Sequence, residues 1–269
     1  MRATLKPMEL ANQRNYLVVE SNDLVRYGRY NLTAQQFNIL CYCISKIKPG
    51  MEEFETYDFD LKDLCAVCGI KITSSNVANF KENIEKLANI TFWWETDEAH
   101  ELHRLFERVK IYKRDTRVSI KIDDVLKPHL LNQRENFIAY LYENVLVMKS
   151  AYSKYLYRLL KSYAFIGEYE TSLIVLKDLL QCSDDYSGRY DNFRRKVLDK
   201  AMEEINLYTD LEVSYKPIRV GRSIEKIHFT IKPKESESYV RAMLERGIVL
   251  NRIENEKNQM RLEGFEEDE

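Results

Sequence analysis

The sequence lacks any apolar run near the roughly 18 residues that a membrane-spanning helix needs, because its longest apolar stretches are short and have charged neighbours. The N-terminus also lacks the apolar core of a signal peptide, since it reads MRATLKPMELANQRN. Both absences argue against a membrane protein and against a secreted one. We therefore expect a cytoplasmic protein with no membrane partner.

Signatures of catalysis are also missing from the sequence. Its histidines are His100, His103, His129 and His228. DNA-nicking replication enzymes need two metal-binding histidines separated by one apolar residue, and zinc proteases need HExxH. The spacing of the histidines here matches neither pattern. A GxxxxGK[ST] phosphate loop is absent too, so ATP hydrolysis is not expected. We expect a protein that is not an enzyme and that needs no cofactor.

The few cysteines fit a reduced, structural role better than a metal site. Cys41 and Cys43 lie in a helical pattern, where residues two apart point to different faces. Cys65 and Cys68 lie where the helix LKDLCAVCGI needs small apolar residues. Disulfides are not expected in a cytoplasmic chain. We predict buried cysteines and no metal, with a four-thiolate zinc site as the alternative.

The net charge of the chain is close to zero, but the charges are unevenly distributed along it. The formal net charge is −2, yet residues 235–269 carry ten acidic and five basic side chains. The rest of the chain is therefore net positive by 3. Residues 189–234 hold eleven Lys and Arg against seven Asp and Glu. This pattern indicates a basic domain followed by an acidic tail.

Two parts of the sequence resemble each other. The tetrapeptide LKDL occurs at 61–64 and at 176–179, and each copy is followed by an Asn-Phe pair, at 79–80 and 192–193. Four residues after each phenylalanine comes a branched apolar residue, Ile84 in one copy and Val197 in the other, one helical turn further along the same face. We interpret these matches as an internal repeat.

Each copy has the element order of a winged helix. A helical stretch precedes LKDL in both copies, at 32–47 and 153–167, and β-rich runs follow the Asn-Phe helix. Asp60 and Ser172 can cap the second helix of each copy. The stretch KPIRVGRSIEK supplies Pro217 and Gly221 for the tip of the second wing. The predicted fold is α+β, with two tandem winged-helix domains, each a helix-turn-helix plus a β-hairpin wing.

Chain length and the position of Pro128 give the expected domain boundaries. A chain of 269 residues is comfortable for two domains of roughly 110 residues each. The expected segments are an N-terminal arm at 1–15, a first winged-helix domain at 16–130, a second at 131–234, and an acidic C-terminal tail at 235–269.

The cationic start of the last predicted helix, NFRRKVLDKAMEEIN, is the strongest functional signal. At about 100° per residue, Arg195 and Lys196 face outward together with Asn192, opposite the apolar stripe. Arg194 falls toward the apolar side, where its long side chain can still reach solvent. Such a helix suits the DNA major groove, because Arg and Asn pair with base edges and Lys holds phosphate. The alternative is a solvated face with pairs such as Arg195 with Asp199.

The equivalent helix of the first copy has balanced charges, so only weak DNA contacts are expected there. The candidate contacts are Asn76, Asn79 and Lys81. This copy is instead a candidate for self-association. The aromatic stretch at 92–94 either packs against a second subunit or belongs to the core.

The chain resembles the plasmid replication initiators, the Rep proteins that bind direct repeats called iterons. Three segments carry the resemblance: YLVVESNDLVRYGRYNLTAQQFNILCYCISKI, YSKYLYRLLKSY and NFRRKVLDKAMEEINLYTDLEVSYKPIRVGRSIEKIHFTI. Together they span roughly residues 16–233. The last segment is the most specific of the three.

This resemblance implies a second winged helix that dominates DNA binding and a first one that mediates dimerisation. Rep proteins open the origin as monomers, repress their own gene as dimers, and recruit the host initiator and the replicative helicase. Carried onto this chain, the DNA-binding positions are Asn192, Arg194, Arg195, Lys196, Lys200, Arg219 and Arg222. A winged-helix transcription regulator without an initiator role is the alternative.

Overall fold

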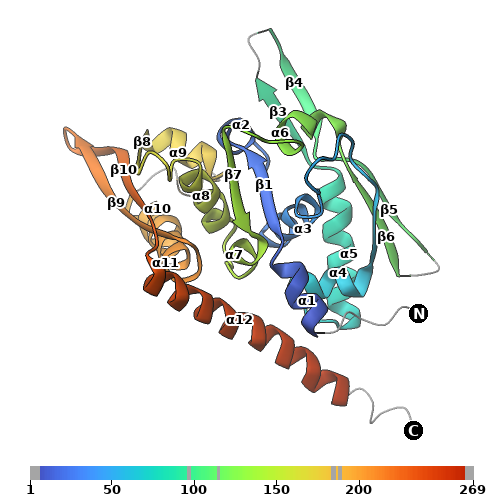
Figure 1. Ribbon diagram of the computed structural model, residues 1–269. Helices are drawn as coiled ribbons and strands as arrows, with labels where there is room; N and C mark the ends of the chain where they lie inside the picture. The colour runs from blue at the N-terminus through green and yellow to red at the C-terminus, as the bar shows by residue number, and fades with distance from the viewer. Residues whose placement is uncertain (1–6, 96–97, 114–115, 183–185, 187–189, 264–269) are drawn as a thin grey trace.

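A computed structural model describes residues 7–95, 98–113, 116–182, 186 and 190–263 (Figure 1). Its first half contains α1 (Pro7–Arg14), β1 (Leu17–Ser21), α2 (Asn22–Tyr27), α3 (Ala34–Ile44), β2 (Tyr57–Asp60), α4 (Leu61–Val67), α5 (Ser74–Ala88), β3 (Thr91–Glu95), β4 (His100–Arg104), β5 (Phe106–Ile111) and β6 (Arg117–Ile122). A 3-10 turn, η1 (Asp124–Leu126), and α6 (Lys127–Leu130) follow.

The second half repeats much of this order of elements, apart from the β3–β4 hairpin and the terminal helix. It contains β7 (Phe137–Leu141), α7 (Tyr142–Leu146), α8 (Ala151–Lys161), β8 (Glu168–Ser172), α9 (Leu173–Leu179), α10 (Tyr190–Phe193), a π-helical turn η3 (Arg194–Leu198), α11 (Asp199–Tyr208), β9 (Leu211–Val220), β10 (Ser223–Pro233) and α12 (Ser236–Glu263). None of the helices in the described ranges combines the length and apolar content needed to cross a membrane.

Both halves have winged-helix topology, as predicted. In each half a short strand precedes the second helix and pairs with the last strand of the wing hairpin, giving the strand orders β2-β6-β5 and β8-β10-β9. The helices and small sheets of both units contribute buried residues to one continuous apolar core. The β3–β4 hairpin of the first unit has no counterpart in the described part of the second, so it is an insertion between the third helix and the wing.

Local capping explains where the second helix of each unit begins. The Asp60 carboxylate accepts hydrogen bonds from the backbone N–H groups of Lys62 and Asp63, at 2.9 and 3.3 Å. The Ser172 hydroxyl accepts one from Val175 at 3.2 Å. These bonds satisfy backbone donors that a helix leaves free at its N-terminus. Both predicted caps are confirmed.

The repeated tetrapeptide does not occupy equivalent positions in the two units. LKDL starts at the first residue of α4 but at the fourth residue of α9, because α9 begins at Leu173. The Asn-Phe match is structurally meaningful, since Phe80 and Phe193 are both fully buried on the third helix of their unit. The folded units therefore repeat, whereas the four-letter match is shifted by nearly one helical turn.

The two units meet at the centre of the molecule through strands that the sequence analysis did not predict. β1 and β7 pair antiparallel, with Val19 opposite Ala139 at the middle of the register. Each strand leads into a short helix and then into the first helix of its unit, so β1-α2-α3 is repeated as β7-α7-α8. This pairing crosses the expected domain division at 130/131, which stays a prediction.

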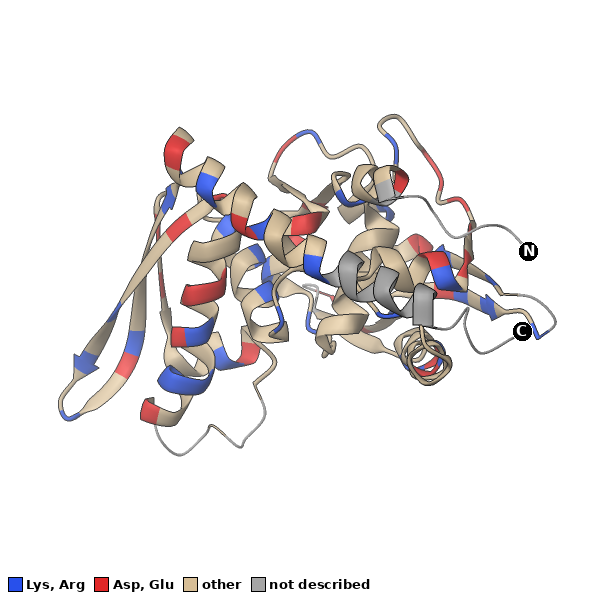
Figure 2. Ribbon diagram, turned by 90° about the horizontal axis from the view of Figure 1, so that it is seen from below, with Lys and Arg blue, Asp and Glu red and all other residues tan. Residues whose placement is uncertain are grey.

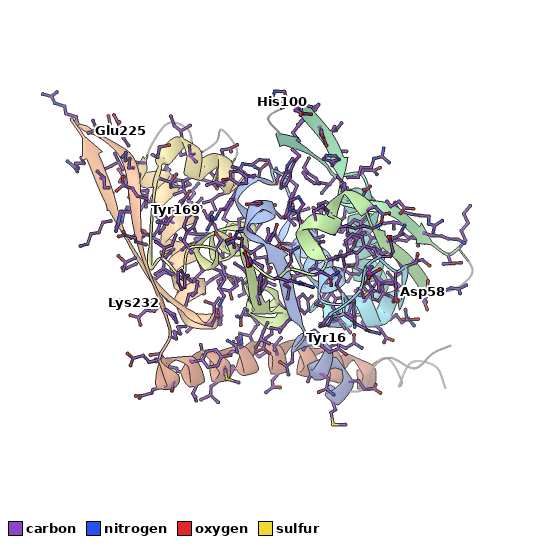
Figure 3. The ribbon with its side chains drawn as sticks, turned by 45° about the horizontal axis from the view of Figure 1, so that its top comes forward. Tyr16, Asp58, His100, Tyr169, Glu225 and Lys232 are labelled. Carbon is purple, nitrogen blue, oxygen red and sulfur yellow. The ribbon has the colours of Figure 1, made fainter. Side chains whose placement is uncertain are left out.

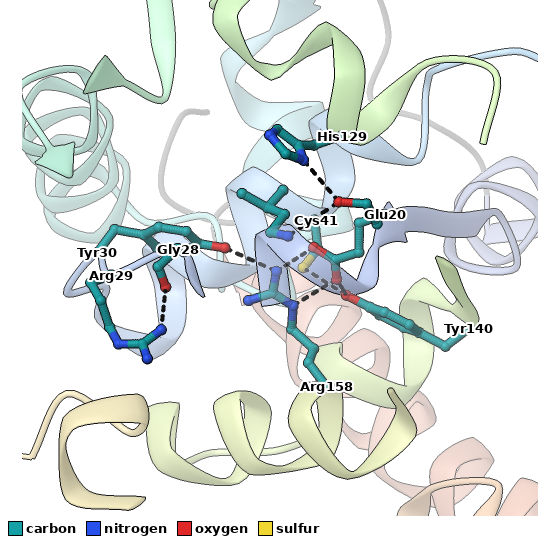
Figure 4. Close-up of polar contacts among 10 residues, drawn as sticks. Glu20, Gly28, Arg29, Tyr30, Cys41, His129, Tyr140 and Arg158 are labelled. Carbon is teal, nitrogen blue, oxygen red and sulfur yellow. Dashed lines mark hydrogen bonds and ion pairs between the residues drawn. The ribbon is translucent and has the colours of Figure 1, made fainter. Parts of the chain in front are cut away.

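A buried ion pair joins the two units beside these strands (Figure 4). Glu20 of β1 and Arg158 of α8 are 0% and 3% exposed, and the Arg158 Nε donates to the Glu20 carboxylate at 2.6 Å. The hydroxyl of Tyr140 also donates to Glu20, and Arg158 donates to the hydroxyl of Tyr30. A buried charge pair requires such additional hydrogen bonds to offset its desolvation.

The predicted wing turn needs one correction. Gly221 lies at the tip with a φ of 63°, a conformation that favours glycine at the first position of a two-residue hairpin turn. Pro217 lies instead inside β9, opposite Ile227. A proline is tolerated there because β9 is an edge strand, so its missing N–H breaks no ladder bond to an outer neighbour.

The segments outside the two units are helical where the structure describes them. α1, from the expected N-terminal arm, packs on α4, and the buried Arg14 donates to the carbonyl of Ala66 at 2.9 Å. The expected acidic tail forms α12, which packs on α11. The four cysteines at 41, 43, 65 and 68 are buried, as predicted.

Candidate nucleic-acid interface

The cationic helix of the second unit begins with α10 and continues through η3 into α11. Phe193, Val197 and Leu198 are buried and fix the helix against the unit. The side chains expected to contact DNA lie on the other side: Arg194, Arg195, Lys196 and Lys200 are exposed, and Asn192 is half-buried. The apolar stripe therefore orients a continuous set of cations toward solvent.

The π turn changes the expected positions on this helix. The backbone N–H of Asp199 donates to the carbonyl of Arg194, five residues earlier, as a π-helical turn requires. Arg194, at the start of this turn, is exposed, although a regular helix would direct it toward the apolar side. Such single turns occur frequently at functional sites, and this one contains three of the expected DNA contacts.

Asp199 is the acidic partner inside the cluster, but it does not pair with Arg195. Its carboxylate lies 3.4 Å from the Arg194 guanidinium and accepts a hydrogen bond from the hydroxyl of Tyr215 on β9, at 2.6 Å. Arg195 forms no ion pair with any described residue. The ammonium of Lys196 lies 5.9 Å from the centre of the Tyr186 ring. Arg195 and Lys196 thus keep their charges available for an external anion.

The second wing extends from the same part of the unit. β9 and β10 form a long hairpin, with Glu225 near its outer end and Lys232 near its base (Figure 3). Arg219 and Arg222 are exposed close to the Gly221 turn. The Tyr215–Asp199 hydrogen bond ties this hairpin to the cationic helix. Lys and Arg lie both at the start of that helix and at the hairpin tip, on one side of the molecule (Figure 2).

The expected contacts of the first unit are less available. Asn76 is half-buried, and its side chain donates to the backbone carbonyl of Lys71 at 3.0 Å. Asn79 is exposed and Lys81 is half-buried. Further along α5, Lys86 pairs with Glu82 at 2.7 Å, which cancels one of the few remaining cations.

The wing of the first unit is more basic than its helix, and the sequence analysis missed it. Lys110 and Arg117 lie over the ring of Tyr112, at 4.4 and 4.0 Å from its centre. Lys113 is exposed next to them. The sequence KIYKRDTR already indicates a basic nucleic-acid contact, because it places four cations and one acid around a tyrosine at a hairpin tip.

Comparison with known proteins agrees with this architecture. A family model described as "Initiator Replication protein, WH1" matches residues 17–161, and one described as "Initiator Rep protein, WH2" matches residues 172–231. No curated protein matches the chain in sequence.

Two solved structures were found by comparison of the whole fold, and the first of them shares it. The Pi initiator protein, in a crystal structure with iteron DNA, has a TM-score of 0.65 and 20% identity, over 83% of this chain and 99% of that one. Domains 2 and 3 of RctB have a TM-score of 0.47 and 11% identity, over 78% of this chain and 86% of that one.

Proposed function

The chain belongs to the family of initiator replication proteins, and we propose that it starts plasmid replication by binding direct repeats in the double-stranded DNA of an origin. The observation that carries this proposal is the exposed cationic start of the α10–α11 helix beside an exposed basic wing. The fold shared with the Pi initiator, which was crystallised with iteron DNA, supports the same conclusion.

The second unit is the principal reader of the repeat. Arg195 is exposed and forms no ion pair with a described residue, so its planar guanidinium is available for a guanine edge in the major groove. Lys196 and Arg222 are placed to hold phosphates on either side of that contact. Arg194 is already close to Asp199, which fixes the direction of its side chain and leaves one face for the DNA backbone.

The first unit contributes a second contact through its wing rather than its helix. The cations around Tyr112 form a group that suits the DNA backbone. Because Glu82 pairs with Lys86, the surface of α5 has little net positive charge to attract DNA. Binding through both units makes one chain span more of the repeat than one winged helix alone.

We further propose that the chain self-associates through the inserted β3–β4 hairpin, as a dimer that represses its own gene. Trp93 and Leu102 lie opposite each other on the outer face of this hairpin and are 59% and 54% exposed. A large exposed apolar pair of this kind favours a protein contact. By family resemblance, the host replication initiator and the replicative helicase are the other partners.

The test measures binding to a fluorescent repeat duplex and to a scrambled duplex across a salt series. Arg195→Ala should weaken binding to the repeat by about 1–3 kcal/mol and change the scrambled duplex little, because only a base contact carries sequence information. Lys196→Ala should weaken both and lower the salt slope by about 1. Lys86→Ala, a cation already paired within the chain, is the control.

Two outcomes would contradict the proposal. If Arg195→Ala is folded and binds both duplexes like the wild type, the cluster is a solvated helix face. If the protein binds the repeats but does not open the adjacent duplex, as measured by permanganate reactivity of unpaired thymines, it acts as a regulator of transcription instead of an initiator.

A further inference from the structure

α12 lies beyond the last residue that the family models match, and it runs along one edge of the molecule (Figure 1). Its inner side is firmly anchored. Arg246 is fully buried and donates to the Glu143 carboxylate of α7 and to the carbonyl of Tyr208, at 2.8 and 2.7 Å. Ala242, one turn earlier, is 2% exposed. These contacts hold the helix in one orientation, so its opposite side is presented to solvent in a fixed way.

That opposite side is apolar. Val240, Leu244 and Ile248 follow one another at intervals of four residues and are 54%, 65% and 48% exposed, and Met243 beside them is 47% exposed. At about 100° per residue, an arc of about 140° between residues 240 and 251 contains no charged side chain. A surface helix normally has one apolar stripe, whereas a helix packed between two layers has two. The described chain covers the inner stripe and leaves the outer one uncovered.

Gly247 lies within the same arc, and the fold gives no reason for it. A Cβ added at this position would meet nothing within 4 Å, so neither a close contact nor an unusual backbone requires glycine here. Glycine in a helix interior is less stable than alanine. Its value is that a second helix can approach the backbone closely at this point.

The charges that border the arc are complementary to themselves. Arg241 and Glu245 lie on one flank, four residues apart, and neither forms an ion pair with a described residue. A two-fold axis brings the same flank of two helices together and reverses their direction. Arg241 of one copy would then face Glu245 of the second copy, and the reverse pair would form as well.

We propose that the outer face of α12 binds the α12 of a second copy of this chain, antiparallel, with the two-fold axis near Met243 and Leu244. This contact is separate from the hairpin contact proposed above. A stable interface buries about 800 Å² on each partner. Because the apolar arc of α12 is short, we expect weak self-association that is detected only at high protein concentration.

The test is sedimentation equilibrium of the full chain, in which Trp93→Ser and Leu102→Ser remove the hairpin contact. Against this background, Arg241→Glu and Glu245→Arg should each weaken self-association about tenfold, because each places like charges opposite each other twice. An equimolar mixture of these two variants should associate again, since one variant then presents two acidic side chains on this flank and the other presents two basic ones. The double swap in one chain should also restore association.

Three further variants distinguish this specific contact from nonspecific association of exposed apolar side chains and from loss of folding. Leu244→Gln should weaken self-association, whereas Ile174→Gln, at an 82% exposed apolar position on α9, should not. Gly247→Gln should raise the melting temperature of the monomer but weaken association, because it favours the helix and blocks the close approach.

The proposal is overturned if the hairpin-deficient chain stays monomeric at several hundred micromolar, or if the charge variants associate equally well alone and mixed. Repeat-DNA affinity of every variant, measured by fluorescence anisotropy, reports separately on the proposed DNA-binding function.

Discussion

A lysine with no carboxylate partner among the described residues lies at the contact between the two units, and it makes a sharp prediction about pH. Lys154 of α8 is fully buried, and its ammonium donates to the Asn38 side chain of α3 at 2.7 Å and to the carbonyl of Val145 on α7. Burial lowers the pKa of Lys154 to about 7, and only the more distant Cys41, Glu204 and Cys68 oppose this effect.

The sign and size of the effect follow from this pKa. The folded pKa lies below the ordinary value of 10.5, so between these values the unfolded chain binds a proton that the folded chain does not. Stability from this group is therefore lowest below pH 7 and rises as the pH increases toward 10.5. From pH 7 to 8.5 the free energy of unfolding should gain on the order of 1–2 kcal/mol from Lys154 alone.

The measurement is urea unfolding of the wild type and of Lys154→Met at several values between pH 7 and 8.5. Burial also lowers the pKa of Lys46 and Lys234, to about 8, so the difference between the two proteins isolates Lys154. The buried Cys41, with a pKa raised to about 12, has the opposite effect only above pH 9. Lys200→Met, at an exposed position of α11, should keep the wild-type slope. Parallel curves for the wild type and Lys154→Met would refute the reasoning.

Two further predictions concern the ion pair between the units and the wing of the first unit. Glu20→Gln should lower the free energy of unfolding by about 3–5 kcal/mol, because it leaves Arg158 buried without its counter-ion; the double variant with Arg158→Met should recover much of this loss in urea unfolding. Lys113→Ala should reduce the slope of log affinity against log salt by about 1 if the first wing holds a phosphate, and an unchanged slope would place that wing away from DNA.

The parts of the fold that depend on local signals could be predicted from the sequence. The caps at Asp60 and Ser172 act over three residues, and the burial of Phe80 and Phe193 follows from helical periodicity. The exposure of Arg195 and Lys196 follows from the same periodicity, whereas that of Arg194 does not. These features are determined by residues that are close together in the sequence, so they can be predicted without the tertiary structure.

The features that were missed depend on residues far apart in the chain. The pairing of β1 with β7 joins residues about 120 positions apart. The sequence of a five-residue strand does not indicate which distant strand it will pair with. Glu20, Lys154 and Arg158 read as ordinary solvated charges until the tertiary structure buries them. The shift of LKDL by three residues shows the related error, in which matching letters are taken as matching positions.

The central pairing also bears on the proposed recognition of a direct repeat by one chain. Antiparallel pairing of two equivalent strands is the arrangement that a local two-fold axis produces, and Val19 opposite Ala139 marks its centre. A direct repeat has no such two-fold symmetry. A chain with two identical DNA-binding units related by a two-fold axis would therefore fit it poorly. The two units differ in the chemistry of their third helix: α5 pairs Lys86 with Glu82, whereas the other unit exposes Arg195 and Lys196. This difference breaks the symmetry of the fold, so that under the proposed function a single chain would bind its DNA site in one orientation only.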